Sequence, residues 1–171
     1  MNSRTRFLSA AVTLMVLVSV NPALAAENPK PLPGVKASDL ITNLENRRWK
    51  CTKPEQAKEA LDSSTIAKGT STFNCASKDK SATVIAWSTS SKNITWITVN
   101  STTRISYGWP RFLATLPMDG VNPTAAQKWV TSALDAKASS NKVFGDIRFS
   151  VLIGSGIART LTIAHKSAVQ P

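Results

Sequence analysis

Basic side chains that could bind an anion are concentrated in one short stretch of the sequence. Arg47, Arg48, Lys50 and Lys53 lie within seven residues and surround Trp49. Guanidinium and ammonium groups bind phosphates, sulfates and carboxylates, and an adjacent aromatic ring can stack on a base or a sugar. This stretch therefore predicts a binding surface for a polyanion.

A second segment, residues 104–111, mixes cations with aromatic rings in the same way. Trp96 lies in a predicted strand, and if it faces away from the helices it contributes to an exposed aromatic patch on the sheet. Such a patch would suit a protein partner. The binding candidates from these segments are Arg47, Arg48, Lys50, Lys53, Trp96, Tyr107, Trp109 and Arg111.

The whole chain is strongly basic, with a formal net charge of +11. This excess favours an anionic polymer or an acidic membrane surface as the partner. It is also explained by a solvated surface that only keeps the protein soluble. No nucleic-acid-binding motif is present to decide between these interpretations.

Cys51 and Cys75 are the only two cysteines, and we expect them to form a disulfide if the protein is exported. Their spacing differs from that of a Cys-x-x-Cys redox motif. A loop of about 25 residues closed in this way should stabilise the fold by roughly 3 to 4 kcal/mol. Two thiols and a single distant histidine make a poor zinc site, so no metal or cofactor is expected.

Signals of catalysis are sparse, and the sequence predicts that the protein is not an enzyme. A serine hydrolase would have to use His165, the single histidine, with the glycine-flanked Ser155. The segment Gly154–Gly156 is too short for a Gly-x-Ser-x-Gly elbow and joins two predicted strands. A hydrolase with two carboxylates stays open as an alternative, because such pairs meet in space rather than in sequence; Glu55 and Glu59 are better explained as a solvated helix face.

Residues 1–25 have the pattern of a cleaved signal peptide. Arg4 and Arg6 precede an apolar run over residues 7–20, and Ala23 and Ala25 occupy the small-residue positions of a cleavage site. The apolar run is shorter than the roughly 20 residues of a membrane-spanning helix, and no later stretch approaches that length. The sequence thus predicts export, to a bacterial periplasm or the outside of the cell, without a transmembrane segment.

The remaining chain divides into three parts. Residues 26–36 contain three prolines and are predicted to form an extended leader outside the core. Residues 37–166 have the size of a single globular domain, and 167–171 should be a frayed tail. Loss of Arg4 and Arg6 leaves 19 basic and 10 acidic residues, so the exported form would carry a net charge of about +9.

The clearest structural signal runs from Val121 to His165. Asn122 can cap a helix that has Pro123 in its first turn and an apolar stripe at helical spacing. In residues 147–153, and again from Ile157 onward, apolar residues instead occupy every second position, as in a β-strand. The pattern predicts a hairpin that turns at Gly154–Gly156.

Earlier segments carry weaker patterns. Ser38 is the predicted N-cap of a short helix over residues 39–46, residues 49–51 are expected to be extended, and Asp119 and Gly120 should turn the chain. Further helices are predicted over 54–61 and 108–116, and strands over 70–77, 82–89 and 93–100.

Together these patterns predict an α+β domain. Its mostly antiparallel sheet of about five strands would carry one long and two or three short helices on one face, with a single disulfide; an all-β sandwich is the alternative fold. The function that fits best is an exported, non-enzymatic binding module, possible ligands being anionic envelope components. The alternatives are a small envelope-polymer hydrolase and an inhibitory or structural protein that binds a protein partner, the latter favoured by an exposed edge strand over residues 94–99.

Overall fold

The computed structural model describes residues 30–56, 70–88 and 93–168. The predicted signal peptide, Glu59 and most of the predicted helix at 54–61 lie outside these ranges. The elements are α1 (Ala37–Glu45), β1 (Lys50–Cys51), β2 (Glu55–Gln56), β3 (Ser71–Ala76), β4 (Ala82–Ser88), β5 (Ile94–Ser101), the 3-10 helix η1 (Ile105–Tyr107), α2 (Gly108–Leu113), α3 (Pro123–Asp135), β6 (Ser140–Phe144), β7 (Ile147–Ile153) and β8 (Arg159–His165).

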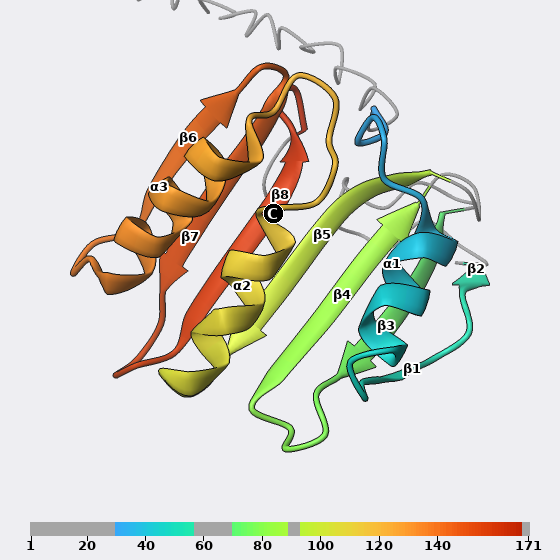
Figure 1. Ribbon diagram of the computed structural model, residues 1–171, viewed down its shortest axis with the longest axis horizontal. Coiled ribbons are helices and arrows are strands. Elements are labelled where there is room, and N and C mark those ends of the chain that lie inside the picture. Colours follow the sequence, from blue (N-terminus) through green and yellow to red (C-terminus); the bar gives the residue numbers. More distant parts are fainter. Residues whose placement is uncertain (1–29, 57–69, 89–92, 169–171) are drawn as a thin grey trace, which may run out of the picture.

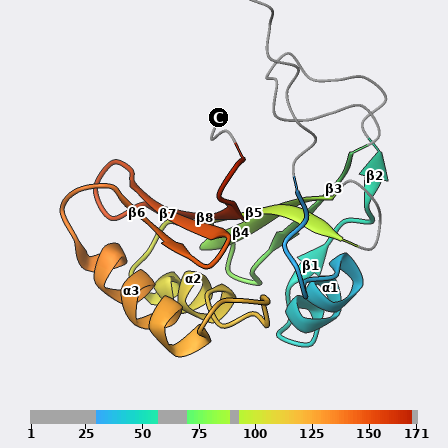
Figure 2. The same cartoon turned by 90° about the horizontal axis from the view of Figure 1, so that it is seen from above.

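One antiparallel sheet forms the centre of the fold, and the three α-helices pack on one of its faces (Figures 1 and 2). Seven strands follow in the order β1-β3-β4-β5-β8-β7-β6, and β2 pairs with β3 beside β1. The α+β class is confirmed, but the sheet is wider than the predicted five strands. Of the additional strands, β2 and β6 lie outside the predicted extended segments, whereas β1 falls in residues 49–51, which are expected to be extended.

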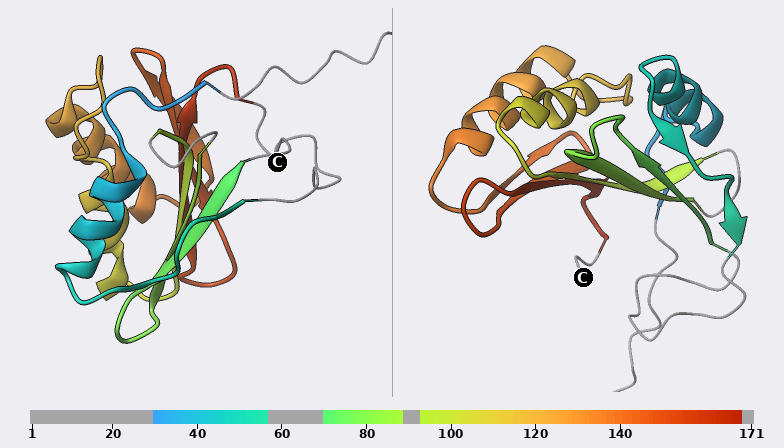
Figure 3. Two further views of the ribbon diagram at one scale, coloured as in Figure 1. Left: turned by 90° about the vertical axis from the view of Figure 1, so that its right-hand side faces the viewer. Right: turned by 90° about the horizontal axis from the view of Figure 1, so that it is seen from below.

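The sheet and the helices form two layers, as the side and bottom views in Figure 3 show, and the buried core lies between them. Val84, Val99, Leu161 and Val151 are cross-strand neighbours in register, and all four are fully buried. Side chains alternate between the two faces of a strand, so this row is the inner surface of four adjacent strands. The predicted alternation in these segments is confirmed.

Helix α3 begins as its sequence predicts. The Asn122 side chain accepts a hydrogen bond from the Ala125 N–H, and Pro123 is the first helical residue. Ala126, Val130 and Leu134 are its buried stripe. Its cap and its apolar period thus specify the same element.

Strand β6 was not predicted because its sequence has no apolar alternation. It forms one edge of the sheet, and four of its five residues are exposed. An edge strand needs no buried face, so its pattern resembles a polar loop. The hairpin expected from β7 and β8 is therefore part of a three-stranded meander.

Three local predictions are wrong. Glu55 and Gln56 are strand β2 rather than helix, because they pair with Thr72 and Ser71 of β3. The N-cap of α1 is Lys36 without a side-chain hydrogen bond, and Ser38 lies inside the helix. Ile157 belongs to the exposed turn before β8 rather than to its inward face.

The leader segment is also closer to the core than predicted. Leu32 is only 1 % exposed, and its N–H donates to the carbonyl of Ile94. Val35 is buried, and its carbonyl accepts from the N–H of Ile94. The prediction that residues 26–36 lie outside the core is thus wrong for the part that the structure describes, because Leu32 and Val35 belong to the buried core.

The disulfide between Cys51 and Cys75 is confirmed. The two cysteines are directly opposite each other where β1 pairs with β3. Since β1 has only two residues, the covalent link reinforces a very short ladder. Within the described ranges, no helix is long and apolar enough to cross a membrane.

Candidate functional site

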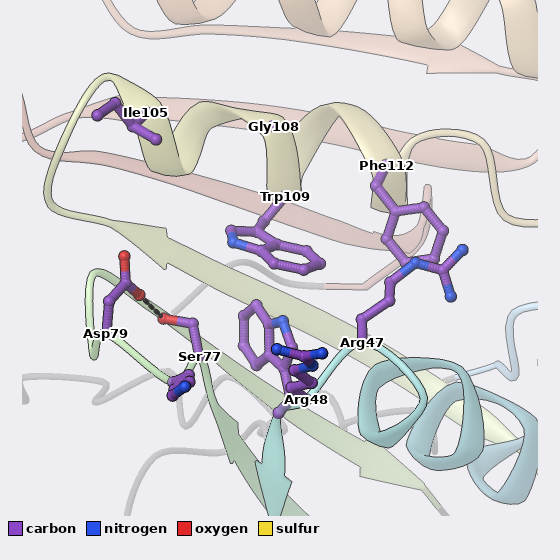
Figure 4. A pocket seen from close by; sticks show the side chains of 10 residues that line it. Arg47, Arg48, Ser77, Asp79, Ile105, Gly108, Trp109 and Phe112 are labelled. Carbon is purple, nitrogen blue, oxygen red and sulfur yellow. Dashed lines mark hydrogen bonds between the residues drawn. The ribbon is translucent and has the colours of Figure 1, made fainter.

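A cleft of about 760 Å³ opens at the end of the domain where the predicted basic stretch lies. We call it the basic cleft (Figure 4). It lies between the corner that joins α1 to β1, the turn between β3 and β4, and the segment of η1 and α2. Its lining residues are Arg47, Arg48, Trp49, Ser77, Lys78, Asp79, Ile105, Gly108, Trp109 and Phe112.

The corner after α1 places two arginines at the cleft. The N–H of Trp49 donates to the carbonyl of Leu44, and the N–H of Arg48 donates to that of Glu45. This pair of bonds is a Schellman motif, in which glycine usually occupies the left-handed position. Here that residue is Arg48, with φ of 65°. A cation thus occupies a position where glycine would be conformationally easier.

The β3–β4 turn is organised by Asp79. Its carboxylate accepts hydrogen bonds from the hydroxyls of Ser77 and Ser81, at 2.6 Å and 2.8 Å, and from the Ser81 N–H at 3.2 Å. These bonds, the one from Ser77 above all, lower the pKa of Asp79 below its ordinary value of 3.8. Lys78 and Lys80 flank the carboxylate, and Lys80 also has a positive φ of 58°.

The opposite wall of the cleft is held by a hydrogen-bonded loop between β5 and α2. Thr103 and Ser106 bond reciprocally through their side chains and backbone N–H groups. Both the N–H and the hydroxyl of Thr102 donate to the carbonyl of Ser81, which ties this loop to the β3–β4 turn. Ile105, in the same segment, is 92 % exposed at the rim of the cleft.

Aromatic rings connect the walls. Trp49 is 4 % exposed, and its ring packs edge-to-face against that of Trp109 with centroids 4.6 Å apart. Trp109 in turn contacts Phe112, and the guanidinium of Arg47 lies over the Phe112 ring at 4.3 Å. Trp109 is half-buried and its side chain extends from α2 into the space between the walls (Figure 4). The Trp49 Nε1 has no hydrogen-bond partner among the described residues.

The charge of the lining is mainly positive. Arg47, Arg48 and Lys78 are exposed, and none of them forms an ion pair with a residue that the structure describes. Asp79 is the one carboxylate in the lining, and three protein donors already bind it. The cleft thus presents cations without an ion-pair partner among the described residues, beside an aromatic ring.

The structure brings together Arg47, Arg48 and Trp109 from the predicted binding residues. Lys50 and Lys53 are exposed on and after β1, outside the lining. The other three predicted residues have different surroundings.

Tyr107 is buried, and its hydroxyl donates to the carbonyl of Ile157. Arg111 pairs with Asp135 of α3 at 3.8 Å. Trp96 lies on the sheet face opposite the helices, but it is only 8 % exposed, and its Nε1 donates to the Thr98 hydroxyl. It therefore does not supply the exposed aromatic patch that the sequence suggested.

Sequence reasoning missed the residues that complete the cleft. No local pattern marks Phe112, Gly108, Ile105 or Asp79 as a binding residue. Arg47 and Phe112 are 65 positions apart, so no local spacing could have paired them. The one available signal is the Lys-Asp-Lys sequence of residues 78–80, which lies between the strands predicted over 70–77 and 82–89.

The residues considered for catalysis do not meet. Ser155 lies in the turn before β8, and His165 is the last residue of that strand, so the strand separates them by roughly 20 Å. The His165 Nδ1 instead contacts the hydroxyl of Ser167 at 2.7 Å. In the described part of the chain, no group of three or more His, Cys, Asp or Glu side chains could hold a metal ion.

The chain matches no protein-family model, no curated protein and no solved structure.

Proposed function

We propose that the protein is an exported, non-enzymatic binding module that holds an anionic ligand, such as an anionic polymer of the cell envelope, in the basic cleft. The observation that carries this proposal is the convergence of Arg47, Arg48 and Lys78 with Trp109 around one cavity. These residues come from three segments of the chain. A surface charge that served only solubility would not need to gather beside an aromatic ring.

The backbone of the cleft supports the same proposal. The non-glycine residues with positive φ in the described chain are Arg48 and Lys80, and both are cations at this end of the domain. Glycine would adopt either conformation with less strain. Cations at these positions are reasonable if their charge contributes to binding.

The test is the affinity of the purified protein for anionic polymers across a salt series. The variant Arg47→Gln/Arg48→Gln removes two cations of the cleft, and Lys128→Gln/Lys137→Gln removes two exposed cations on and after α3. We expect the first variant to lose about tenfold or more in affinity, since two charge-assisted contacts are lost. Its salt slope should fall by about 1.5, and the control should change little.

The proposal would be contradicted if the unaltered protein and both double variants bound equally weakly and this binding disappeared near physiological salt. In that case the positive charge acts as a diffuse surface property.

A further inference from the structure

The two walls of the basic cleft differ in chemistry. Ile105, Trp109 and Phe112 form one wall, on η1 and α2. The opposite wall carries the arginines of the α1–β1 corner and Asp79 of the β3–β4 turn (Figure 4). A ligand that fills the cleft must therefore present an apolar face to one side and polar, mainly anionic groups to the other.

Asp79 restricts the ligand further. A carboxylate has about four lone-pair sites, and the hydrogen bonds from Ser77 and Ser81 use three of them. Two of these bonds are made to Oδ1 and one to Oδ2. The side chain is exposed and remains ionised at neutral pH, since its pKa is lowered. It can accept a hydrogen bond from a ligand hydroxyl, but it repels a phosphate or a carboxylate.

We infer that the ligand of the basic cleft is an acidic saccharide, a conclusion that rests on the proposed function. Its sugar ring would pack its apolar face on Trp109, its anionic substituent would bind Arg47 and Arg48, and a hydroxyl would donate to Asp79. A sugar unit carries all three features on one ring. A lipid has no sugar ring whose apolar face could pack on Trp109, unless its headgroup is itself a sugar. A nucleic acid strand presents dense phosphates to Asp79.

Gly108 provides a way to test occupation of the cleft without changing its charge. This residue lines the cleft at the start of α2, and a Cβ atom added to it meets no atom within 4 Å. Its φ of −56° suits any L-residue. Gly108→Phe should therefore fill the cleft without strain, and Gly108→Ala is the matched control.

The experiment measures binding of the full protein and its variants by calorimetry or tryptophan fluorescence. The probes are oligogalacturonate, a heparin oligosaccharide, fully methyl-esterified oligogalacturonate, inorganic polyphosphate, oligothymidylate and phosphatidylglycerol vesicles. We expect saturable binding of at least one of the two acidic saccharides and weak binding of the neutral ester. Gly108→Phe should reduce acidic saccharide binding tenfold or more, and Gly108→Ala, which adds a single methyl group, should reduce it far less.

Asp79→Asn separates the saccharide from other polyanions by the sign of its effect. The amide keeps an acceptor oxygen for Ser77 but removes the negative charge and the acceptor on the second oxygen. Saccharide affinity should fall about tenfold, since a hydrogen bond to a charged group is lost. Polyphosphate and oligothymidylate affinity should rise about two- to threefold, since a repulsive charge is removed. A cooperative thermal unfolding transition in each variant confirms that it folds.

The outcomes distinguish failure of the saccharide inference from failure of the proposed anion-binding function. If polyphosphate, oligothymidylate or vesicles bind best, and Asp79→Asn strengthens every interaction, the saccharide inference is overturned while the anion-binding function stands. The inference also fails if Gly108→Phe leaves saccharide binding intact. If no probe binds in a way that depends on Arg47 and Arg48, both proposals fail.

Discussion

The guanidinium of Arg47 lies over the ring of Phe112, 4.3 Å from its centroid, and joins the end of α1 to α2. The same guanidinium donates to the carbonyl of Asn43, so its position is fixed from both sides. Both side chains line the basic cleft.

We expect the side chains of Arg47 and Phe112 to stabilise the folded state in an energetically coupled way. A double-mutant cycle with Arg47→Met and Phe112→Leu, measured by urea unfolding, should give a coupling of about 0.5 to 1 kcal/mol, as for cation–π pairs near a surface. Phe112→Leu should also weaken anion binding because Arg47 becomes less ordered. A coupling of zero would mean that the two side chains are neighbours without mutual stabilisation.

Arg48→Gly should separate stability from binding. Glycine relieves the positive φ at the end of α1, so we expect the free energy of unfolding to rise by about 1 kcal/mol. Anion affinity should fall, because a cation of the cleft is lost. Lys80→Gly is the control, since it relieves a similar φ outside the lining and should stabilise with a smaller effect on binding. A loss of stability in Arg48→Gly would show that the side chain makes structural contacts that outweigh the strain.

Removal of the disulfide should affect both the fold and the cleft. Cys51 and Cys75 link β1 to β3, and Trp49 is only two residues before Cys51. Cys51→Ala/Cys75→Ala should lower the free energy of unfolding by about 3 to 4 kcal/mol on the chain-entropy model. Because β1 then rests on a two-residue ladder, anion binding should weaken as well. Urea unfolding with and without reductant provides the measurement, and equal midpoints would contradict the expectation.

The lowered pKa of Asp79 predicts how stability depends on acid. Its folded-state pKa lies below 3.8, mainly because the Ser77 hydroxyl binds the charged form. The carboxylate therefore stabilises the folded state above the unfolded-state pKa, and this contribution is lost as the pH falls through the lower, folded-state value. Asp146, whose pKa is lowered by Lys166, acts in the same direction.

Asp79→Asn should accordingly show a smaller fall in melting temperature between pH 5 and pH 2 than the unaltered protein. The two proteins should have parallel profiles above pH 5. Direct titration of the Asp79 carboxyl by NMR should give a pKa below the ordinary value, and a value at or above 3.8 would refute this interpretation.

Tyr107 should contribute to stability rather than to binding. Its hydroxyl donates to the Ile157 carbonyl from a buried position, and Arg159 lies over its ring at 6.0 Å. Tyr107→Phe should cost about 1 to 2 kcal/mol of unfolding free energy, because a partly buried carbonyl loses its donor. Anion affinity should stay within twofold of the unaltered protein. If the Tyr107→Phe variant is stable but has lost affinity for the anion, Tyr107 contributes to binding after all.

Local patterns predicted the elements that have a buried face and a marked start. Helix α3 could be predicted because Asn122 and Pro123 begin it and Ala126 and Val130 repeat at helical spacing. The inner strands could be predicted because their apolar residues alternate. By contrast, β6 could not be predicted, since an exposed edge strand requires no such pattern.

The sequence by itself determined the composition of the site: a cluster of cations beside Trp49, a second group around Trp109, and two cysteines with only each other as partners. It could not determine which of these groups meet. Alternation places Trp87 and Trp96 on one face of a strand pair, but only the packing of the helices decides which face is the core. Arg47 and Phe112 meet because α1 and α2 pack on the same face of one sheet. Such long-range contacts depend on burial of the whole apolar face, and no short segment encodes them.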